Sequence, residues 1–161
     1  MIEYRPILQA DLHGVIELST AAGGTSLAKD PERAWRALSA PGVTTIIAID
    51  AGEIVGYAQM QSDGAIQAHL SSIVVAENRR RQGIGGRLIE EAFSRCGAER
   101  VDLTTEDAQA FYRSLAHREW TGFRLFPDCT KEEIQRYDDL RAQGLSDGEA
   151  MRAFEQDGDG D

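Results

Sequence analysis

HLSSIVVAENRRRQGIGGRLI is the sequence of residues 69–89, and it predicts a strand, a glycine-rich turn and the start of a helix. Gly83 and Gly85 permit positive φ angles and a close approach of the backbone to a ligand. The N–H groups of residues 81–86 are then expected to point into the turn, at the positive end of the helix dipole. This arrangement predicts a loop that binds phosphate groups.

The charges around this turn support the same interpretation. Arg79, Arg80 and Arg81 precede the glycines and Arg87 follows them, and this small basic cluster suits a small anionic ligand. A Walker loop would need Gly-Lys-Ser/Thr, which is absent here. A dinucleotide-binding fold would place its glycines early in a βαβ unit, whereas this turn follows a predicted antiparallel meander.

The remaining sequence predicts a mixed α/β chain. Alternating and β-branched residues predict strands at 2–5, 43–49, 54–61, 65–75, 100–104 and 119–126. Helices are expected after Asp11, after the Asp30-Pro31 cap, and over 86–96 and 106–116. Beyond Pro127, capping boxes at Thr130/Glu133 and Ser146/Glu149 predict two further helices.

Two motifs in this order of elements resemble the GCN5-related N-acetyltransferase (GNAT) family. Residues 80–85, RRQGIG, match its Gln/Arg-x-x-Gly-x-Gly/Ala motif, and residues 108–115, AQAFYRSL, resemble its A-x-x-F-Y-x-x-L segment. Thr105 stands where the family often has Asn, and Ala116-His117 replaces its usual Gly-Phe. Only one strand, 119–126, is expected where most members have two.

The resemblance implies a GNAT fold, an α+β arrangement of helices around a mixed, mostly antiparallel sheet, here with a C-terminal helical extension. The expected domains are an acetyltransferase domain at 1–126, a helical extension at 127–155 that packs on the domain or on a dimer partner, and a disordered acidic tail at 156–161.

By the same resemblance the cosubstrate is acetyl-CoA, with no metal. The pantetheine arm would pair with the strand, which in the family bulges and splays from its neighbour, and the diphosphate would lie on residues 81–86. The expected cofactor-binding residues are Ile73, Val74, Val75, Arg80, Arg81, Gln82, Gly83, Ile84, Gly85 and Gly86.

The resemblance also implies two catalytic residues. Tyr112 matches the family tyrosine that protonates the departing thiolate, although an aromatic packed on a helix face would leave the same pattern. His69 lies on the strand that leads to the splay, where relatives place a base for the amine. The alternative is a histidine whose hydrogen-bonding groups are satisfied on a strand face and which has no catalytic role. Alternation places Ser71 on the face of His69, and Trp35 either lines the acceptor site or packs in the core.

The implied function is acetyl transfer from acetyl-CoA to a primary amine of a small molecule or a protein, by direct attack. A non-catalytic acyl-CoA sensor or assembly module is the alternative. A DNA-binding regulator is disfavoured by the net charge of −10, of which residues 127–161 contribute −7. Nucleic acid and membranes are therefore not expected as partners, and family analogy suggests a homodimer. No apolar run long enough to span a membrane and no secretory signal occurs in the sequence, and two cysteines fit a reducing cytoplasm.

Overall fold

The computed structural model describes residues 1–127, 129–145 and 149–150. It divides into two compact units, residues 1–102 and 103–161. The first unit contains the sheet and the glycine-rich loop, and the second contains Tyr112 and the C-terminal residues.

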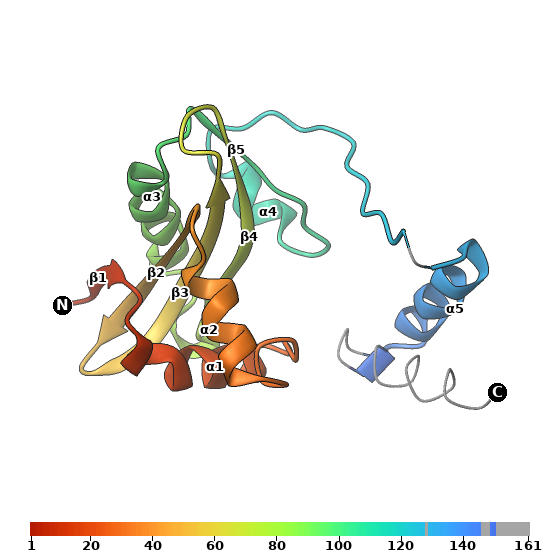
Figure 1. The fold of residues 1–161 in the computed structure, drawn as a ribbon, viewed down its shortest axis with the longest axis horizontal. Coiled ribbons are helices and arrows are strands. Elements are labelled where there is room, and N and C mark those ends of the chain that lie inside the picture. Colours follow the sequence, from red (N-terminus) through yellow and green to blue (C-terminus); the bar gives the residue numbers. More distant parts are fainter. Residues whose placement is uncertain (128, 146–148, 151–161) are drawn as a thin grey trace. The chain divides into compact units, whose positions relative to one another are not determined.

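The first unit is built on a five-stranded sheet in the order β1-β2-β3-β4-β5 (Figure 1). The strands are β1 Glu3–Pro6, β2 Val43–Asp50, β3 Glu53–Ser62, β4 Gln67–Val75 and β5 Arg100–Asp102. The first four pair antiparallel, and β5 pairs parallel with β4. The expected mixed, mostly antiparallel sheet is confirmed.

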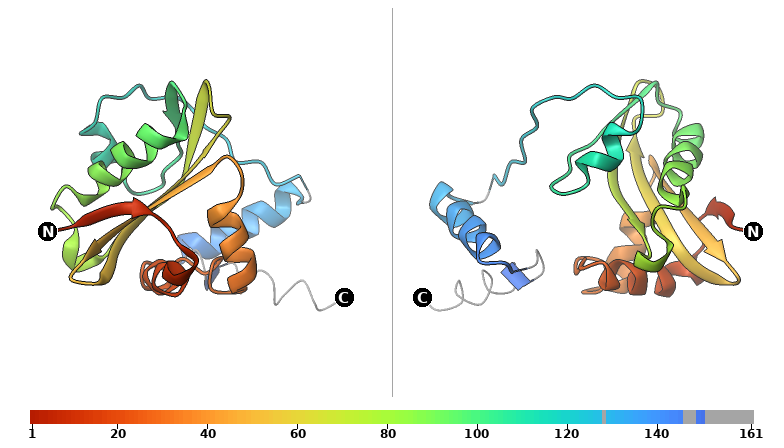
Figure 2. Two further views of the ribbon diagram at one scale, coloured as in Figure 1. Left: turned by 60° about the vertical axis from the view of Figure 1, so that its left-hand side comes forward. Right: turned by 180° about the vertical axis from the view of Figure 1, so that it is seen from behind.

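Three helices cover the two faces of this sheet. They are α1 Leu12–Ala21, α2 Pro31–Ser39 and α3 Ile84–Cys96. α1 and α2 lie on one face and α3 lies on the other (Figure 2). The Asp30 carboxylate caps α2 by accepting hydrogen bonds from the amides of Glu32 and Arg33 at 3.0 and 3.1 Å, as the Asp-Pro pattern predicts.

The core has one layer on each face. Val15, Leu38, Ile47 and Tyr57 are buried together between the sheet and the first two helices. On the opposite face α3 approaches β3 so closely that a Cβ at Gly56 would lie 3.0 Å from Leu88. Burying these apolar side chains on both faces holds β3 and β4 in register beneath the loop that follows β4.

The β2–β3 turn is a tight hairpin. Ala51 and Gly52 both have positive φ angles, 51° and 87°, as a two-residue turn of the I′ type requires. The turn joins Asp50 directly to its register partner Glu53. It therefore fixes the position of the Asp50 side chain at the end of β2.

The second unit contains two described helices, α4 Gln109–Arg113 and α5 Lys131–Ala142. The expected capping box of α5 is present, because Thr130 and Glu133 exchange hydrogen bonds at 2.6 and 3.2 Å. The predicted second tail helix falls largely on residues 146–148 and 151–155, which lie outside the described residues, as does the predicted disordered tail at 156–161. No helix within the described ranges is long and apolar enough to cross a membrane.

Two predictions for this unit are wrong. The helix expected over 106–116 is reduced to α4, and the strand expected over 119–126 is absent. Trp120, Phe123 and Leu125 instead have exposed fractions of 71%, 83% and 81%. Alternating aromatic and aliphatic residues indicate that a segment suits a strand, but a strand also needs a hydrogen-bonding partner. Residues 119–126 have no such partner in the described part of the chain.

Gly97, which follows the end of α3, allows a test of how closely the chain there packs against the turn at Gly64 between β3 and β4. Gly97 has a φ of 73°, and a Cβ there would lie 2.9 Å from the carbonyl oxygen of Gly64, whereas Gly52, with a φ of 87°, has nothing within 4 Å. Gly97→Ala adds a clash to backbone strain and should lower the free energy of unfolding by about 2 kcal/mol or more. Gly52→Ala should lower it by about 1 kcal/mol through strain alone. Urea unfolding measures both, and equal losses would contradict the close approach of Gly97 to Gly64.

Candidate functional site

β4 contains a bulge at its centre. Gln59 of β3 pairs with Ser72, but the next residue, Met60, pairs with Leu70, so Ser71 has no partner across the ladder. A bulge bends a strand and increases its twist. The resemblance to the GNAT family predicted this bulge, and the register places it at Ser71.

β4 also separates from β5 halfway along its length. β5 pairs only with residues 67–69 of β4, and His69 opposite Asp102 is the last pair. Within the described residues, β4 from Leu70 to Val75 is therefore paired with β3 on one edge and with no strand on the other. Free backbone N–H and C=O groups on such an edge bind extended chains that carry amides. The predicted residues Ile73, Val74 and Val75 lie on this open edge.

The chain then enters the glycine-rich loop. The Ala76 amide donates to the Val55 carbonyl at 2.9 Å, and a short 3-10 turn follows over Glu77–Arg79. Arg81 and Gly83 then adopt left-handed conformations, with φ angles of 63° and 79°. A positive φ is uncommon for arginine, and such strained positions concentrate at ligand-binding loops.

The loop ends at the N-terminus of α3, whose first amides are free. Gly83 is the N-cap and supplies no capping side chain, and the first hydrogen bond of the helix runs from the Arg87 amide to the Gly83 carbonyl at 3.1 Å. The amides of Ile84, Gly85 and Gly86 have no acceptor among the described residues. A Cβ at Gly83 or Gly86 would meet nothing within 4 Å. Free amides at a positive helix end, facing open space, fit a diphosphate.

The basic side chains near the loop divide into two groups. Arg80 and Arg81 are exposed and so contribute charge to the loop surface. Arg79 instead forms an ion pair with Asp50 of β2, and Arg87 pairs with Glu90 and Glu91 on its own helix. All four arginines were expected to raise the local potential, but carboxylates offset the charges of Arg79 and Arg87.

His69 lies where β4 and β5 part. Its side chain is exposed, as is that of Ser71, while Ala68 and Leu70 between them are buried. The two polar side chains thus share a face, as alternation predicted. The imidazole has no hydrogen bond or ion pair to any residue that the structure describes, so the contacts shown give it no structural role.

A half-buried polar contact beside the bulge could not be predicted from the sequence. The hydroxyl groups of Tyr57 and Ser72 lie 3.0 Å apart and are hydrogen-bonded. Tyr57 is one of the largest fully buried side chains, and Ser72 is the first residue after the bulge. The bond therefore ties the bent strand to the core, and only the register across β3 and β4 reveals it.

Tyr112 lies in the second unit, on α4. Its ring contacts Phe111 edge to face with the centroids 5.0 Å apart. Burial, followed by the nearby Asp107 charge, raises the pKa of the Tyr112 hydroxyl. The phenol therefore stays protonated at neutral pH and can donate a proton. The structure brings His69, residues 73–75 and residues 80–86 together in the first unit, and it places Tyr112 in the other.

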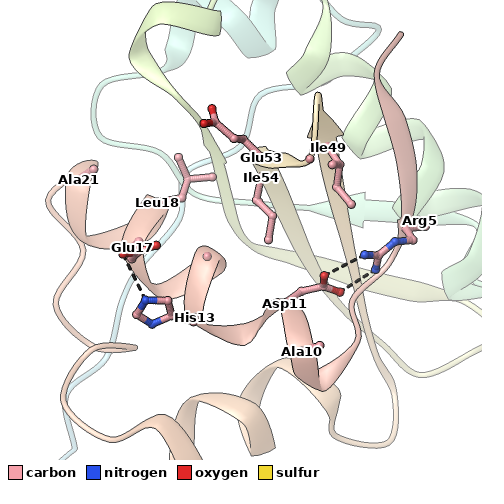
Figure 3. Close-up of a pocket in the computed structure, with 12 residues that line it drawn as sticks. Arg5, Ala10, Asp11, His13, Glu17, Leu18, Ala21, Ile49, Glu53 and Ile54 are labelled. Atoms are coloured by element: carbon pink, nitrogen blue, oxygen red, sulfur yellow. Dashed lines mark hydrogen bonds and ion pairs between the residues drawn. The ribbon is translucent and has the colours of Figure 1, made fainter.

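A separate groove of about 800 Å³ lies between α1 and the β2–β3 hairpin (Figure 3). Asp11, predicted to cap the helix that follows, makes no capping bond to α1. Its carboxylate instead accepts two hydrogen bonds from Arg5, at 2.6 and 2.8 Å, and Figure 3 also shows His13 beside Glu17. The Arg5 hydrogen bonds are the main cause of the lowered pKa of Asp11. The groove shares no residue with the loop or with the open edge of β4.

Comparison with known proteins identifies the family. Residues 41–116, which include the bulged strand, the loop and α4, match the family model of the acetyltransferase (GNAT) domain. The chain carries a domain of the GNAT acetyltransferase family. The GNAT family uses acetyl-CoA, and no cluster of three or more metal-ligating side chains occurs among the described residues.

Solved structures of GNAT acetyltransferases share this fold. A GNAT-family acetyltransferase from Streptococcus pneumoniae TIGR4 is 26% identical with a TM-score of 0.62, over 80% of this chain and 98% of that one. An aminoglycoside acetyltransferase from an uncultured soil metagenomic sample is 21% identical with a TM-score of 0.68, over 80% and 97%. At 16% identity and a TM-score of 0.67, AAC(6')-Iy, solved with a CoA-containing bisubstrate analogue, matches 81% of this chain and 99% of its own.

This chain matches only part of the length of a curated relative. The mycothiol acetyltransferase of Rhodococcus jostii (strain RHA1) is 34% identical over 91 residues, which is 56% of this chain and 30% of that protein. The chain thus spans less than a third of this relative, and the match concerns one GNAT domain.

Two substitutions near the bulge separate a structural from a functional residue. Tyr57→Phe removes a half-buried hydrogen bond and should lower the free energy of unfolding by about 1 kcal/mol. His69→Ala removes an exposed side chain that has no hydrogen bond or ion pair among the described residues, and it should change the free energy of unfolding by less than about 0.5 kcal/mol. Both are measured by urea unfolding. A loss above about 1 kcal/mol in His69→Ala would make His69 a structural residue of the strand.

Proposed function

We propose that the chain is an N-acetyltransferase that transfers the acetyl group of acetyl-CoA to a primary amine by direct attack. One observation carries this proposal: the open edge of β4 leads without interruption into a loop that ends in the free amides of α3. A ligand with an extended chain that carries amides, and with a diphosphate at one end of that chain, fits this arrangement. Its amides would lie on the strand edge and its diphosphate on the helix amides. The match of residues 41–116 to the GNAT domain supports acetyl transfer as the chemistry.

Within this proposal the cosubstrate is bound by backbone more than by side chains. The open edge at Ile73, Val74 and Val75 takes the pantetheine amides, and the amides of residues 81–86 take the diphosphate. The exposed arginines, Arg80 and Arg81, add attraction for the phosphate charge, and Gln82 lies between them and Gly83. Acetyl-CoA supplies a thioester, an acyl donor activated enough for an amine to attack directly.

The proposed chemistry balances with two proton transfers. The amine nitrogen attacks the thioester carbonyl carbon, and the N–H of Val74 or Val75 stabilises the developing oxyanion. His69, or a water that it holds, accepts the proton that the amine loses. The carbon–sulfur bond then breaks, and the Tyr112 hydroxyl gives its proton to the thiolate. No covalent bond to the enzyme forms, so Cys96 and Cys129 need no role.

A panel of amines assayed with acetyl-CoA tests the proposal directly. Release of free CoA thiol is followed with aminoglycosides and with peptides that begin with alanine, because structural relatives include aminoglycoside acetyltransferases and a ribosomal-protein-alanine N-acetyltransferase from Brucella melitensis. Amine-dependent thiol release is the expected result. Tight CoA binding with no thiol release for any amine would favour an acyl-CoA sensor instead.

The diphosphate site is tested by filling the space above α3. Gly86 has open space around its Cβ position and no positive φ, so Gly86→Leu adds a side chain without backbone strain. Leucine is also the better helix former, so the melting temperature should not fall. The affinity for CoA, measured by calorimetry, should fall about tenfold or more, equivalent to at least about 1.4 kcal/mol.

A matched variant on the same helix serves as the control. Ser94 is exposed near the other end of α3, and Ser94→Leu should leave CoA affinity unchanged. If Gly86→Leu binds CoA as tightly as the wild-type protein, the diphosphate does not lie on these amides.

The proton pathway predicts different kinetic effects for the two catalytic residues. Tyr112→Phe keeps the ring and removes only the hydroxyl, so kcat should fall about 10²-fold or more while CoA affinity stays unchanged. A base acts only when unprotonated, so the rate should fall as pH falls, and His69→Ala should lose this acidic limb. Because burial raises the pKa of Tyr112, any alkaline limb that it causes should lie above the ordinary value of about 10.

The measurement is kcat/KM against pH for both variants with one acceptor. An unchanged acidic limb in His69→Ala would remove His69 from the mechanism. Full activity in Tyr112→Phe would mean that the thiolate leaves without a proton from this residue.

A further inference from the structure

The glycine-rich loop is tied to the β2–β3 hairpin by an ion pair. Nη2 of Arg79, at the start of the loop, contacts Oδ2 of Asp50, the last residue of β2. Both side chains are mostly shielded, with 29% and 23% of their surface exposed. The pair spans 29 positions in the sequence, so it joins two segments that only the fold brings together.

Few other contacts restrain this part of the loop. Among the described residues, the hydrogen bonds of residues 77–82 other than that of Arg79 with Asp50 run within the loop or back to Val75. Only the Ala76 amide, bonded to the Val55 carbonyl, and the ion pair of Arg79 with Asp50 reach the hairpin. The left-handed turn at Arg81 and Gly83 follows directly after Arg79. Its shape therefore depends on where Arg79 is held.

Within the described part of the chain, the Arg79 guanidinium is paired with Asp50 alone. Its Nε atom is buried and has no hydrogen bond, so the carboxylate of Asp50 is its compensating group within the described residues. Removing that carboxylate would leave a half-buried cation unpaired, and such a cation tends to move toward water. The 3-10 turn that carries it would then move as well.

We propose that Asp50 and Arg79 are positioning residues for cosubstrate binding, which hold the loop so that the amides of residues 84–86 face the diphosphate. The inference rests on the proposed function. The three consecutive arginines then have two roles. Arg79 holds the loop in place, while Arg80 and Arg81 attract the negatively charged phosphates. Asp50 touches neither cosubstrate nor acceptor in this account.

The direction in which CoA affinity changes when Asp50 loses its charge distinguishes a positioning role from a purely electrostatic one. Asp50 is an acid close to a loop that binds an anion. If it acted only through its charge, Asp50→Asn would strengthen CoA binding by removing repulsion. A positioning role predicts the opposite, because the loop loses its anchor.

The experiment compares Asp50→Asn with Glu53→Gln by CoA calorimetry. Glu53 is the exposed register partner of Asp50 in the same turn, so its substitution removes the same charge from nearly the same place. We expect about tenfold weaker binding in Asp50→Asn and a change below about twofold in Glu53→Gln. Asp50→Glu, which keeps the carboxylate, should restore most of the affinity. Equal or tighter binding in Asp50→Asn would overturn the proposal.

Hydrogen exchange tests the anchor without any ligand. The amides of Arg79 and Arg80 donate to Ala76 and Glu77 within the turn, and they should exchange faster in Asp50→Asn, while the Ser62 amide at the far end of β3 should not change. Unchanged exchange at Arg79 and Arg80 would also overturn the proposal. Should Asp50→Asn fail to fold, Arg79→Met breaks the same pair, and exchange at Arg80 gives the same two outcomes. If the wild-type protein does not bind CoA, the proposed function fails, and the exchange result still decides whether the ion pair orders the loop.

Discussion

The site depends on the separation of β4 from β5 after His69. β4 stays paired with β3 along nearly its whole length, whereas β5 follows it only for residues 67–69. An unpaired strand edge is an aggregation hazard in most proteins, and here we propose that its backbone groups bind the pantetheine amides. Because β4 runs directly into the loop and α3, the open edge and the free helix N-terminus follow one another along the chain. The separation therefore leaves the edge of β4 open, and the loop then leads to the free amides of α3 that Gly83 leaves uncapped.

Much of this arrangement was predictable from residues 69–89. The β-branched end of the strand, the glycines and the amphipathic helix each indicate their element, and the element order matched the GNAT family. The position of the bulge was not predictable from HLSSIVV, because a bulge is a property of the register with β3. The ion pair of Arg79 with Asp50 was not predictable either. In the sequence, Asp50 only indicates a turn, and its proximity to the loop depends on the fold.

Two of the errors in the prediction share one physical cause, which is that a local sequence pattern does not show which partner a segment or side chain will have. Residues 119–126 have the composition of a strand but no neighbour to pair with among the described residues. The third helix was expected to begin at Gly86, but it begins at Ile84 because Gly83 adopts the left-handed conformation that ends the loop. Asp11 has the residue type of a helix cap, yet Arg5 competes successfully for its carboxylate. A missing or competing partner decided the first and last of these cases, and the backbone conformation of Gly83 decided where α3 begins.

We propose that CoA lies along the open edge of β4, with its diphosphate on the amides of α3. An NMR titration of the ¹⁵N-labelled protein with CoA tests this claim most directly, because it reports on backbone amides one by one. This placement of CoA predicts that the largest amide shifts occur at residues 73–75 and 84–86. Shifts concentrated instead at Gly14, Glu17 and Gly52, around the groove beside α1, would contradict it.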